Sequence, residues 1–205
     1  MRPEKRKWLQ SEFFALAVTL ALVTVARSSL ADHYWVPSGS MEYSLLPGDR
    51  VLVDKTAYGL RIPLTKIDLV GAVTPRRGDV AVFDSPRDGV RLIKRVVAIG
   101  GDVVSLADGR LTINGQELGA GAPGAENASA RETFERTEAE LNLDRGGGPD
   151  IPPTVVPQGK LLVLGDHRGD SFDGRFFGFI DERELYGRAV AVFYRSGEGF
   201  GWKEL

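Results

Sequence analysis

Short apolar runs bounded by Gly-Asp pairs constrain the fold of this chain more than any other feature. Such a pair stands directly before three runs rich in Val, Leu and Ala, and directly after a fourth. The pairs are Gly48-Asp49, Gly78-Asp79, Gly101-Asp102 and Gly165-Asp166. Gly and Asp favour turns, and short apolar runs between turns are typical of strands. The sequence therefore predicts a mainly β protein with mainly antiparallel strands.

The remaining sequence fits this pattern, with one segment undecided. Asn114-Gly115, inside the run 111–116, is the pair expected in a tight hairpin, and 188–194 alternates like a final strand. Residues 131–143 are compatible with an exposed helix or with a charged edge strand, and the pattern leaves both open.

Two stretches are predicted to connect elements rather than form them. Residues 119–130 are rich in Gly and Ala, which predicts a loop. Gly and Pro at 146–149 and at 152–153 predict a linker before the chain returns to the core.

Composition removes several kinds of catalytic site. The chain has no Cys, which excludes thiol nucleophiles, Cys-ligated zinc and disulfides. Its two histidines, His33 and His167, leave little basis for a Ser–His–Asp triad or a metal centre. No metal and no cofactor is predicted. The net charge of −2 at pH 7 gives no support to a nucleic-acid partner.

The N-terminus has the pattern of a membrane-targeting segment. Four basic side chains lie within the first seven residues, before an apolar run at 13–26 that its flanks extend to spanning length. A cleavable signal peptide ending in Ser29-Leu30-Ala31 fits the same segment, and either interpretation exports the rest of the chain. We expect a basic cytoplasmic tail at 1–10, a transmembrane anchor at 11–31, and the remainder outside the bacterial inner membrane.

One candidate nucleophile lies just beyond that segment. In the sequence Pro37-Ser38-Gly39-Ser40-Met41, small residues allow a sharp turn that exposes a hydroxyl and nearby N–H groups. A Ser hydroxyl is a weak nucleophile unless a base lies beside it. Taken alone, Ser-Gly-Ser is more often an ordinary turn.

One candidate base lies on a predicted strand at 90–98. Side chains alternate between the faces of a strand, which makes Lys94 the one charge on the face formed by Val90, Leu92, Val96 and Ala98. A buried amine has a lowered pKa and can act as a general base. The alternative is a Lys at a strand edge that extends to water. The absence of a thiol and the scarcity of His favour a Ser–Lys pair over other hydrolytic sites.

Four motifs, in the expected order behind the N-terminal segment, resemble those of the type I signal peptidases. They are residues 37–41 with 45–49, residues 78–83, residues 93–98 with 101–102, and residues 165–175 followed by 178–179 and 187–189. The resemblance implies a membrane-bound serine endopeptidase that removes signal peptides from exported preproteins. The roles that it implies are nucleophile for Ser40, general base for Lys94, oxyanion binding for Ser38, orientation of the Lys94 amine for Ser171, and support of the loop for Asp173 and Arg175. A purely structural role for the last two stays open.

The resemblance also implies an architecture and a mode of substrate binding. A catalytic β domain would comprise 32–102 and 160–205, with an inserted β region at 103–159 between them. Signal peptides would bind as an added strand, with small side chains at the first and third positions before the cut. Exposed aromatics such as Trp35, Phe176, Phe177 and Trp202 would rest on membrane lipid, although core packing is the alternative for each. The oligomeric state stays open.

The chain departs from the usual family pattern at Tyr43-Ser44, at His167 and at Gly169-Asp170. These differences leave open a peptidase dedicated to one substrate. They also leave open a catalytically silent anchored β domain that binds peptides. A cytosolic Ser–Lys autoprotease of the repressor type would need DNA-binding helices and no anchor, the reverse of this chain. His167 adds a titratable group, which suggests an unusual pH response.

Overall fold

The computed structural model describes residues 12–20, 23, 30–61, 68–70, 73–120 and 129–205. Strands dominate the described part, which confirms the prediction of a mainly β protein. The strand pairs within it are all antiparallel.

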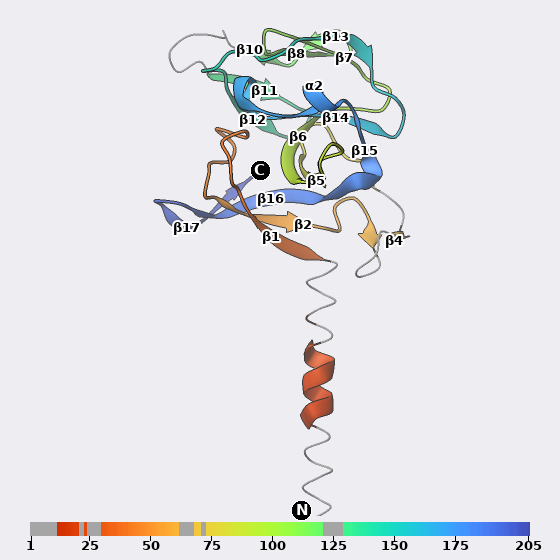
Figure 1. Ribbon diagram of the computed structural model, residues 1–205, viewed down its shortest axis with the longest axis vertical. Helices are drawn as coiled ribbons and strands as arrows, with labels where there is room; N and C mark the ends of the chain where they lie inside the picture. The colour runs from red at the N-terminus through yellow and green to blue at the C-terminus, as the bar shows by residue number, and fades with distance from the viewer. Residues whose placement is uncertain (1–11, 21–22, 24–29, 62–67, 71–72, 121–128) are drawn as a thin grey trace, which may run out of the picture.

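An eight-stranded sheet forms the body of the molecule (Figure 1). Its order is β1-β2-β16-β5-β6-β14-β15, with β17 paired to β16. The strands are β1 (Ala31–Trp35), β2 (Arg50–Asp54), β5 (Val80–Asp84), β6 (Arg91–Ile99), β14 (Lys160–Leu164), β15 (Ile180–Asp181), β16 (Leu185–Arg195) and β17 (Gly199–Glu204). Three short helices, η1 (Arg168–Asp170), α2 (Gly174–Phe177) and η2 (Glu182–Glu184), follow β14 and β15.

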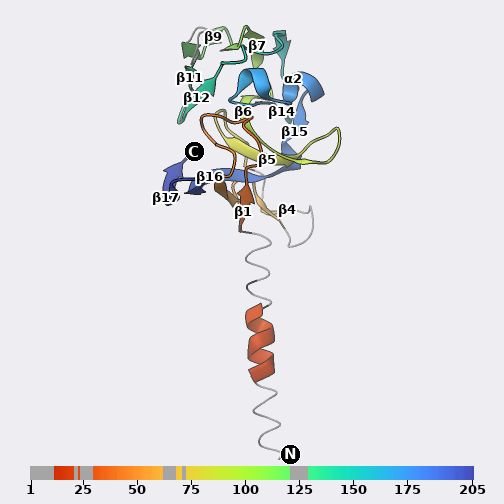
Figure 2. The ribbon, with the colours of Figure 1, turned by 60° about the vertical axis from the view of Figure 1, so that its left-hand side comes forward.

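Two smaller sheets lie at the end of the molecule opposite β1 and β17, as Figure 2 shows from a second direction. One has the order β13-β7-β8-β9 and the other β10-β11-β12. Their strands are β7 (Val103–Ala107), β8 (Arg110–Ile113), β9 (Gln116–Glu117), β10 (Gly119–Ala120), β11 (Ser129–Thr133), β12 (Glu138–Asn142) and β13 (Ile151–Val155). A separate pair joins β3 (Leu60–Arg61) to β4 (Asp68–Val70). The domain boundaries given above stay a prediction.

The structure decides one segment that the sequence left open and corrects two predicted connections. Residues 131–143 resolve to strands, since β11 and β12 alternate buried and exposed side chains. The loop expected at 119–130 is wrong at both ends, which pair in β10 and β11, while 121–128 lie outside the described residues. The linker expected at 152–153 is wrong because both prolines lie in β13. This is an edge strand with a register shift, where a missing N–H is tolerated.

The Gly-Asp turns before β2, β5 and β7 share one geometry. Each Gly has a positive φ, 91° at Gly48 and 95° at Gly78 and Gly101, a conformation that suits a residue without a Cβ. The following Asp carboxylate accepts a backbone N–H from three residues earlier, at 3.0, 3.0 and 2.9 Å respectively. The repeated sequence thus sets the start of each strand through its own hydrogen bonds.

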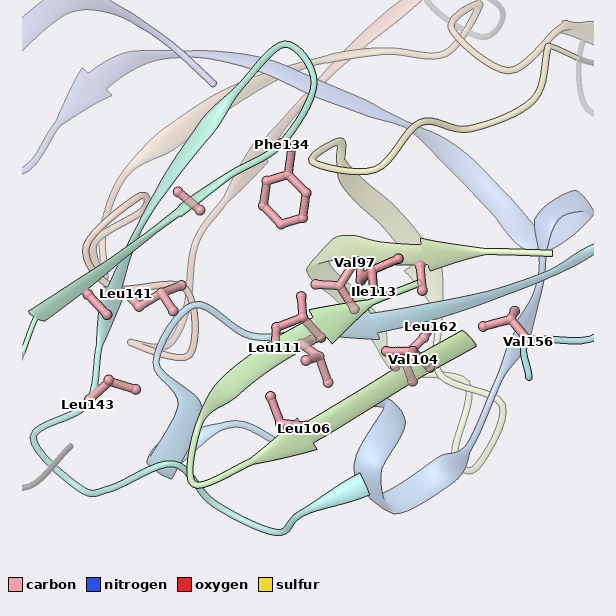
Figure 3. Close-up of a cluster of buried hydrophobic side chains, with 14 residues drawn as sticks. Val97, Val104, Leu106, Leu111, Ile113, Phe134, Leu141, Leu143, Val156 and Leu162 are labelled. Carbon is pink, nitrogen blue, oxygen red and sulfur yellow. The ribbon is translucent and has the colours of Figure 1, made fainter. Parts of the chain in front are cut away.

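A buried apolar cluster joins the large sheet to the smaller ones (Figure 3). Val97 and Leu162 of the large sheet pack in it with Leu111 of β8 and Leu141 of β12. Burying such side chains stabilises a fold by about 1.5–3 kcal/mol each. This cluster brings β12 and the residues after it close to the segment that carries Ser40.

The N-terminal segment is described only in part. Residues 12–20 form a helix that stands clear of the β structure (Figure 1). Within the part of the chain that the structure describes, no helix has the length and apolar character needed to cross a membrane. Much of the anchor expected at 11–31, including 24–29, lies outside the described residues.

Candidate active site

The segment that carries Ser40 is a loop closed at its base and anchored in the core. Val36 and Asp49 meet at the base, where the Val36 N–H donates to the Asp49 carbonyl over 2.9 Å. Met41 and Leu45 are buried, and the Leu45 N–H donates to the Met41 carbonyl. Ser40 itself stays half-buried, so its hydroxyl is held at the surface of a fixed turn.

Lys94 reaches this turn from the middle of β6. It lies opposite Ala81 of β5 in the antiparallel register. Its Nζ donates a hydrogen bond to Ser40 Oγ, although the two residues are 54 positions apart in the sequence. The structure therefore brings together the two residues to which the sequence assigns the nucleophile and the base.

The Lys94 amine lies in a largely desolvated position. The side chain is 3% exposed, and burial lowers the pKa of Lys94 from 10.5 to about 8. The nearby carboxylates of Asp173 and Asp166 oppose this shift, and Arg175 adds to it. An amine with this pKa is partly unprotonated near neutral pH, which is the form that can accept a proton from a hydroxyl.

A small pocket opens beside the Ser40–Lys94 pair. It has a volume of about 130 Å³. Its lining consists of Tyr34, Trp35, Val36, Pro37, Ser38, Ser40, Met41, Arg91, Leu92, Ile93 and Lys94. The Ser38 hydroxyl is exposed and lies 3.4 Å from Ser40 Oγ, so it borders the same space.

Asp173 and Arg175 brace the loop that follows β14. Two guanidinium nitrogens of Arg175 donate to the Asp173 carboxylate at 2.8 Å each, and both side chains are buried. Asp173 also accepts the Gly165 N–H at 2.9 Å. Gly165 has no room for a Cβ, which would lie 2.5 Å from the Ser40 carbonyl oxygen. The ion pair thus connects the loop to the backbone of the Ser40 turn.

Ser171 does not make the hydrogen bond expected for it. Among the described residues, its buried Oγ has no hydrogen-bond partner. The hydroxyl packs closely against Gly165, where a Cβ would overlap it. The predicted hydrogen bond to the Lys94 amine is therefore absent from this structure, and Ser171 borders the site by packing.

A buried ion pair that no sequence pattern predicted lies behind Lys94. Arg95 Nε and Nη2 donate to the two oxygens of Asp166 at 2.9 and 2.7 Å, and Arg95 also donates to Ser44 Oγ and to the Gly78 carbonyl. Arg95 is 2% exposed and Asp166 is fully buried. Both faces of β6 are covered, so alternation along the strand could not distinguish Lys94 from its neighbour. The Gly-Asp pair at 165–166, at the end of a strand, was the sequence feature that pointed to a structural role for Asp166.

A second missed feature surrounds His167. Its buried imidazole lies between the half-buried Glu42 and the exposed Asp144, where three segments of the chain meet. The described residues contain no cluster of His, Asp and Glu arranged to hold a metal ion. The chemistry that the described site offers is that of the Ser40 hydroxyl and the Lys94 amine.

Comparison with known proteins finds relatives over most of the chain. The family model described as signal peptidase, peptidase S26, matches residues 6–194. Signal peptidase I of Pseudomonas fluorescens is 35% identical over 193 residues, covering 84% of this chain and 68% of that protein. Signal peptidase I of Pseudomonas aeruginosa is 32% identical over 194 residues, with the same coverage of both chains. A crystal structure of a signal peptidase I from Enterococcus faecalis V583 aligns at 27% identity and a TM-score of 0.40, covering 58% of this chain and 98% of the other.

The family model and the two Pseudomonas relatives define a serine endopeptidase. The chain belongs to the signal peptidase family, peptidase S26. Its reaction is accordingly the removal of signal peptides, and its substrates are secretory preproteins.

Proposed function

We propose that Ser40 and Lys94 form the catalytic pair of a membrane-bound signal peptidase that cuts after small side chains. The observation that carries this proposal is the hydrogen bond from the buried Lys94 amine to the Ser40 hydroxyl. A Ser hydroxyl needs an adjacent base, and a desolvated amine supplies one without His or Asp.

The proton follows one path through the reaction. The neutral Lys94 amine accepts the Ser40 proton as Oγ attacks the scissile carbonyl, and the resulting ammonium returns that proton to the departing amine. A water molecule then attacks the acyl-enzyme, its proton passes to Lys94, and Ser40 regains a proton when the ester breaks. The Ser38 hydroxyl and the Ser40 N–H would stabilise the oxyanion, since both belong to the turn that presents Oγ.

The pocket beside the pair is where a substrate side chain would bind. Met41, Leu92 and Ile93 line it next to Ser40 and offer an apolar surface to the methyl group of Ala. A substrate strand would lie along the exposed main chain near Pro37 and Ser38.

The N-terminal segment supports the membrane location. Phe13, Phe14 and Leu16 are 62–72% exposed, which favours lipid over water around this helix. The four basic residues before it would keep residues 1–10 in the cytoplasm, with an anchor at 11–31 and the β structure outside. Trp35 and Trp202, each about 60% exposed, would then rest on the lipid surface.

The test is cleavage of a preprotein in detergent by the full chain. We expect wild type to cut after the second Ala of an Ala-x-Ala site. Its cleavage rate should fall by about 100-fold or more when that Ala is replaced by Phe. The Ser40→Ala variant should be inactive. Mass spectrometry of the products identifies the cut. Equal rates for Ala and Phe would contradict the assignment of the pocket, and activity in Ser40→Ala would contradict the nucleophile.

A further inference from the structure

The imidazole of His167 occupies an unusual buried position. The side chain is 5% exposed and lies between two carboxylates. Its Nε2 is 2.7 Å from Asp144 Oδ1, and its Nδ1 is 3.5 Å from Glu42 Oε2. Within the described residues, Nδ1 has no hydrogen-bond partner. A buried ring nitrogen that faces a carboxylate without a hydrogen bond needs an explanation, because such groups are normally satisfied.

The three side chains come from three separate segments of the chain. Glu42 follows the nucleophile by two positions, Asp144 follows β12, and His167 follows β14. Asn142 adds a further link, since its Nδ2 donates to Glu42 Oε2 at 3.3 Å and its backbone forms a bridge with His167. The imidazole therefore lies where the nucleophile loop, the region after β12 and the loop after β14 meet.

His167 also contacts the nucleophile directly through its backbone. Its N–H donates to the Ser40 carbonyl at 3.2 Å. On the other side, the Glu42 N–H donates to the Gly39 carbonyl, and the Glu42 carboxylate covers Gly39 so closely that a Cβ there would lie 2.5 Å from Oε1. An imidazole that is hydrogen-bonded to Glu42 therefore links the two sides of the turn that presents Ser40 Oγ.

The protonation state of the ring decides how many of these bonds form. A neutral ring with its proton on Nε2 donates to Asp144 and presents a lone pair to Glu42, whereas an imidazolium donates to both carboxylates. The charged neighbours on the loop of His167 itself are already paired: Asp166 with Arg95 and Arg168 with Glu132. Asp170, a further charged residue of that loop, pairs with Arg145. Among the described residues, Glu42 and Asp144 are therefore the charged groups that lie against the ring.

We propose that His167 is a positioning residue for Ser40, which holds the nucleophile turn in its active geometry when the imidazolium donates to Glu42 and Asp144 together. The inference rests on the proposed role of Ser40.

The test compares kcat and KM of the full chain in detergent for wild type and His167→Asn, from about pH 5.5 to about pH 9. Lys94 titrates in both enzymes, so its contribution cancels in the ratio of their kcat values. We expect the ratio of wild-type kcat to His167→Asn kcat to be at least about fivefold larger near pH 5.5 than near pH 9. KM should change by less than about twofold. His33→Asn, a variant of the other histidine, whose ring is about half exposed in β1, should leave the wild-type profile unchanged.

A second variant keeps the test independent of any folding defect at residue 167. Glu42→Gln retains the shape of the side chain and removes the charge that the imidazolium needs, so the ratio of wild-type to Glu42→Gln kcat should fall with rising pH as well. A ratio that stays flat with pH in both variants would overturn the proposal and leave His167 a packing residue. Absence of any Ser40-dependent cleavage by wild type would instead overturn the proposed function, and this inference with it.

Discussion

Lys94→Met is expected to lose about 10³-fold or more in cleavage rate and yet to be more stable than wild type at pH 7. The loss follows from removal of the base that takes the Ser40 proton, a contribution of about 10²–10⁴ for a positioned general base. Met fills a similar volume on β6 and carries no charge, so the covered position opposite Ala81 accepts it without a cavity.

The gain in stability follows from the lowered pKa of Lys94. The pKa is about 8 in the folded protein and 10.5 in an ordinary Lys, so the unfolded chain binds more protons between those values. Wild-type stability should therefore rise with pH from about 8 to 10.5. The burial penalty, on the order of 3 kcal/mol, is fully present below pH 8.

Urea unfolding of wild type and Lys94→Met at pH 7 and at pH 10 measures this effect. The variant should be more stable than wild type at pH 7, and the difference should shrink at pH 10. Lys160→Met is the matched control, because Lys160 also lies on a strand of the large sheet but is 41% exposed, so no comparable gain is expected. A Lys94→Met variant that keeps most of its activity, or that loses stability at pH 7, would contradict the account of Lys94 as a buried base.

Arg95→Met is expected to destabilise the protein by about 3–5 kcal/mol. The reason is that Asp166, which is fully buried, would lose the guanidinium that neutralises it. Removing both charges in Arg95→Met/Asp166→Leu should recover much of that loss, because the cost comes chiefly from the isolated buried charge.

Unfolding free energies of the two single variants and the double variant complete a double-mutant cycle. Arg145→Met serves as the control, since Arg145 pairs with Asp170 at 2.8 Å but both side chains are more than half exposed. That variant should cost less than about 1 kcal/mol. Additive effects in the cycle would show that Arg95 and Asp166 are not coupled, against the geometry described.

Local patterns predicted much of the sheet. The Gly-Asp turns act through bonds within a few residues, and Asp49 and Asp79 each accept the N–H of the residue three positions earlier. Such local features can be read without tertiary information. The strand at Pro152 and Pro153 could not be predicted, because only the tertiary structure shows that it lies at a sheet edge, where proline costs little.

The candidate site was predictable where side-chain chemistry was scarce. The absence of Cys and the scarcity of His favoured a Ser–Lys pair as the kind of hydrolytic site. The resemblance to the signal peptidases then selected Ser40 and Lys94, which the structure brings into contact. Long-range partners were not predictable. The hydrogen bond expected for Ser171 is absent because that hydroxyl packs on Gly165 instead. Nor does any pattern in the sequence pair His167 with Asp144, 23 positions away.

The most direct test of the Ser40–Lys94 pair is the mass of the acyl-enzyme. A peptide ester ending in Ala-x-Ala acylates a serine as its alcohol leaves, and acid quenching preserves the enzyme ester for peptide mapping. The account predicts an added acyl group on the peptide that carries Ser40 in wild type, and none in Ser40→Ala or Lys94→Met. Acylation at a different residue, or acylation of Ser40 in Lys94→Met at the wild-type rate, would contradict it.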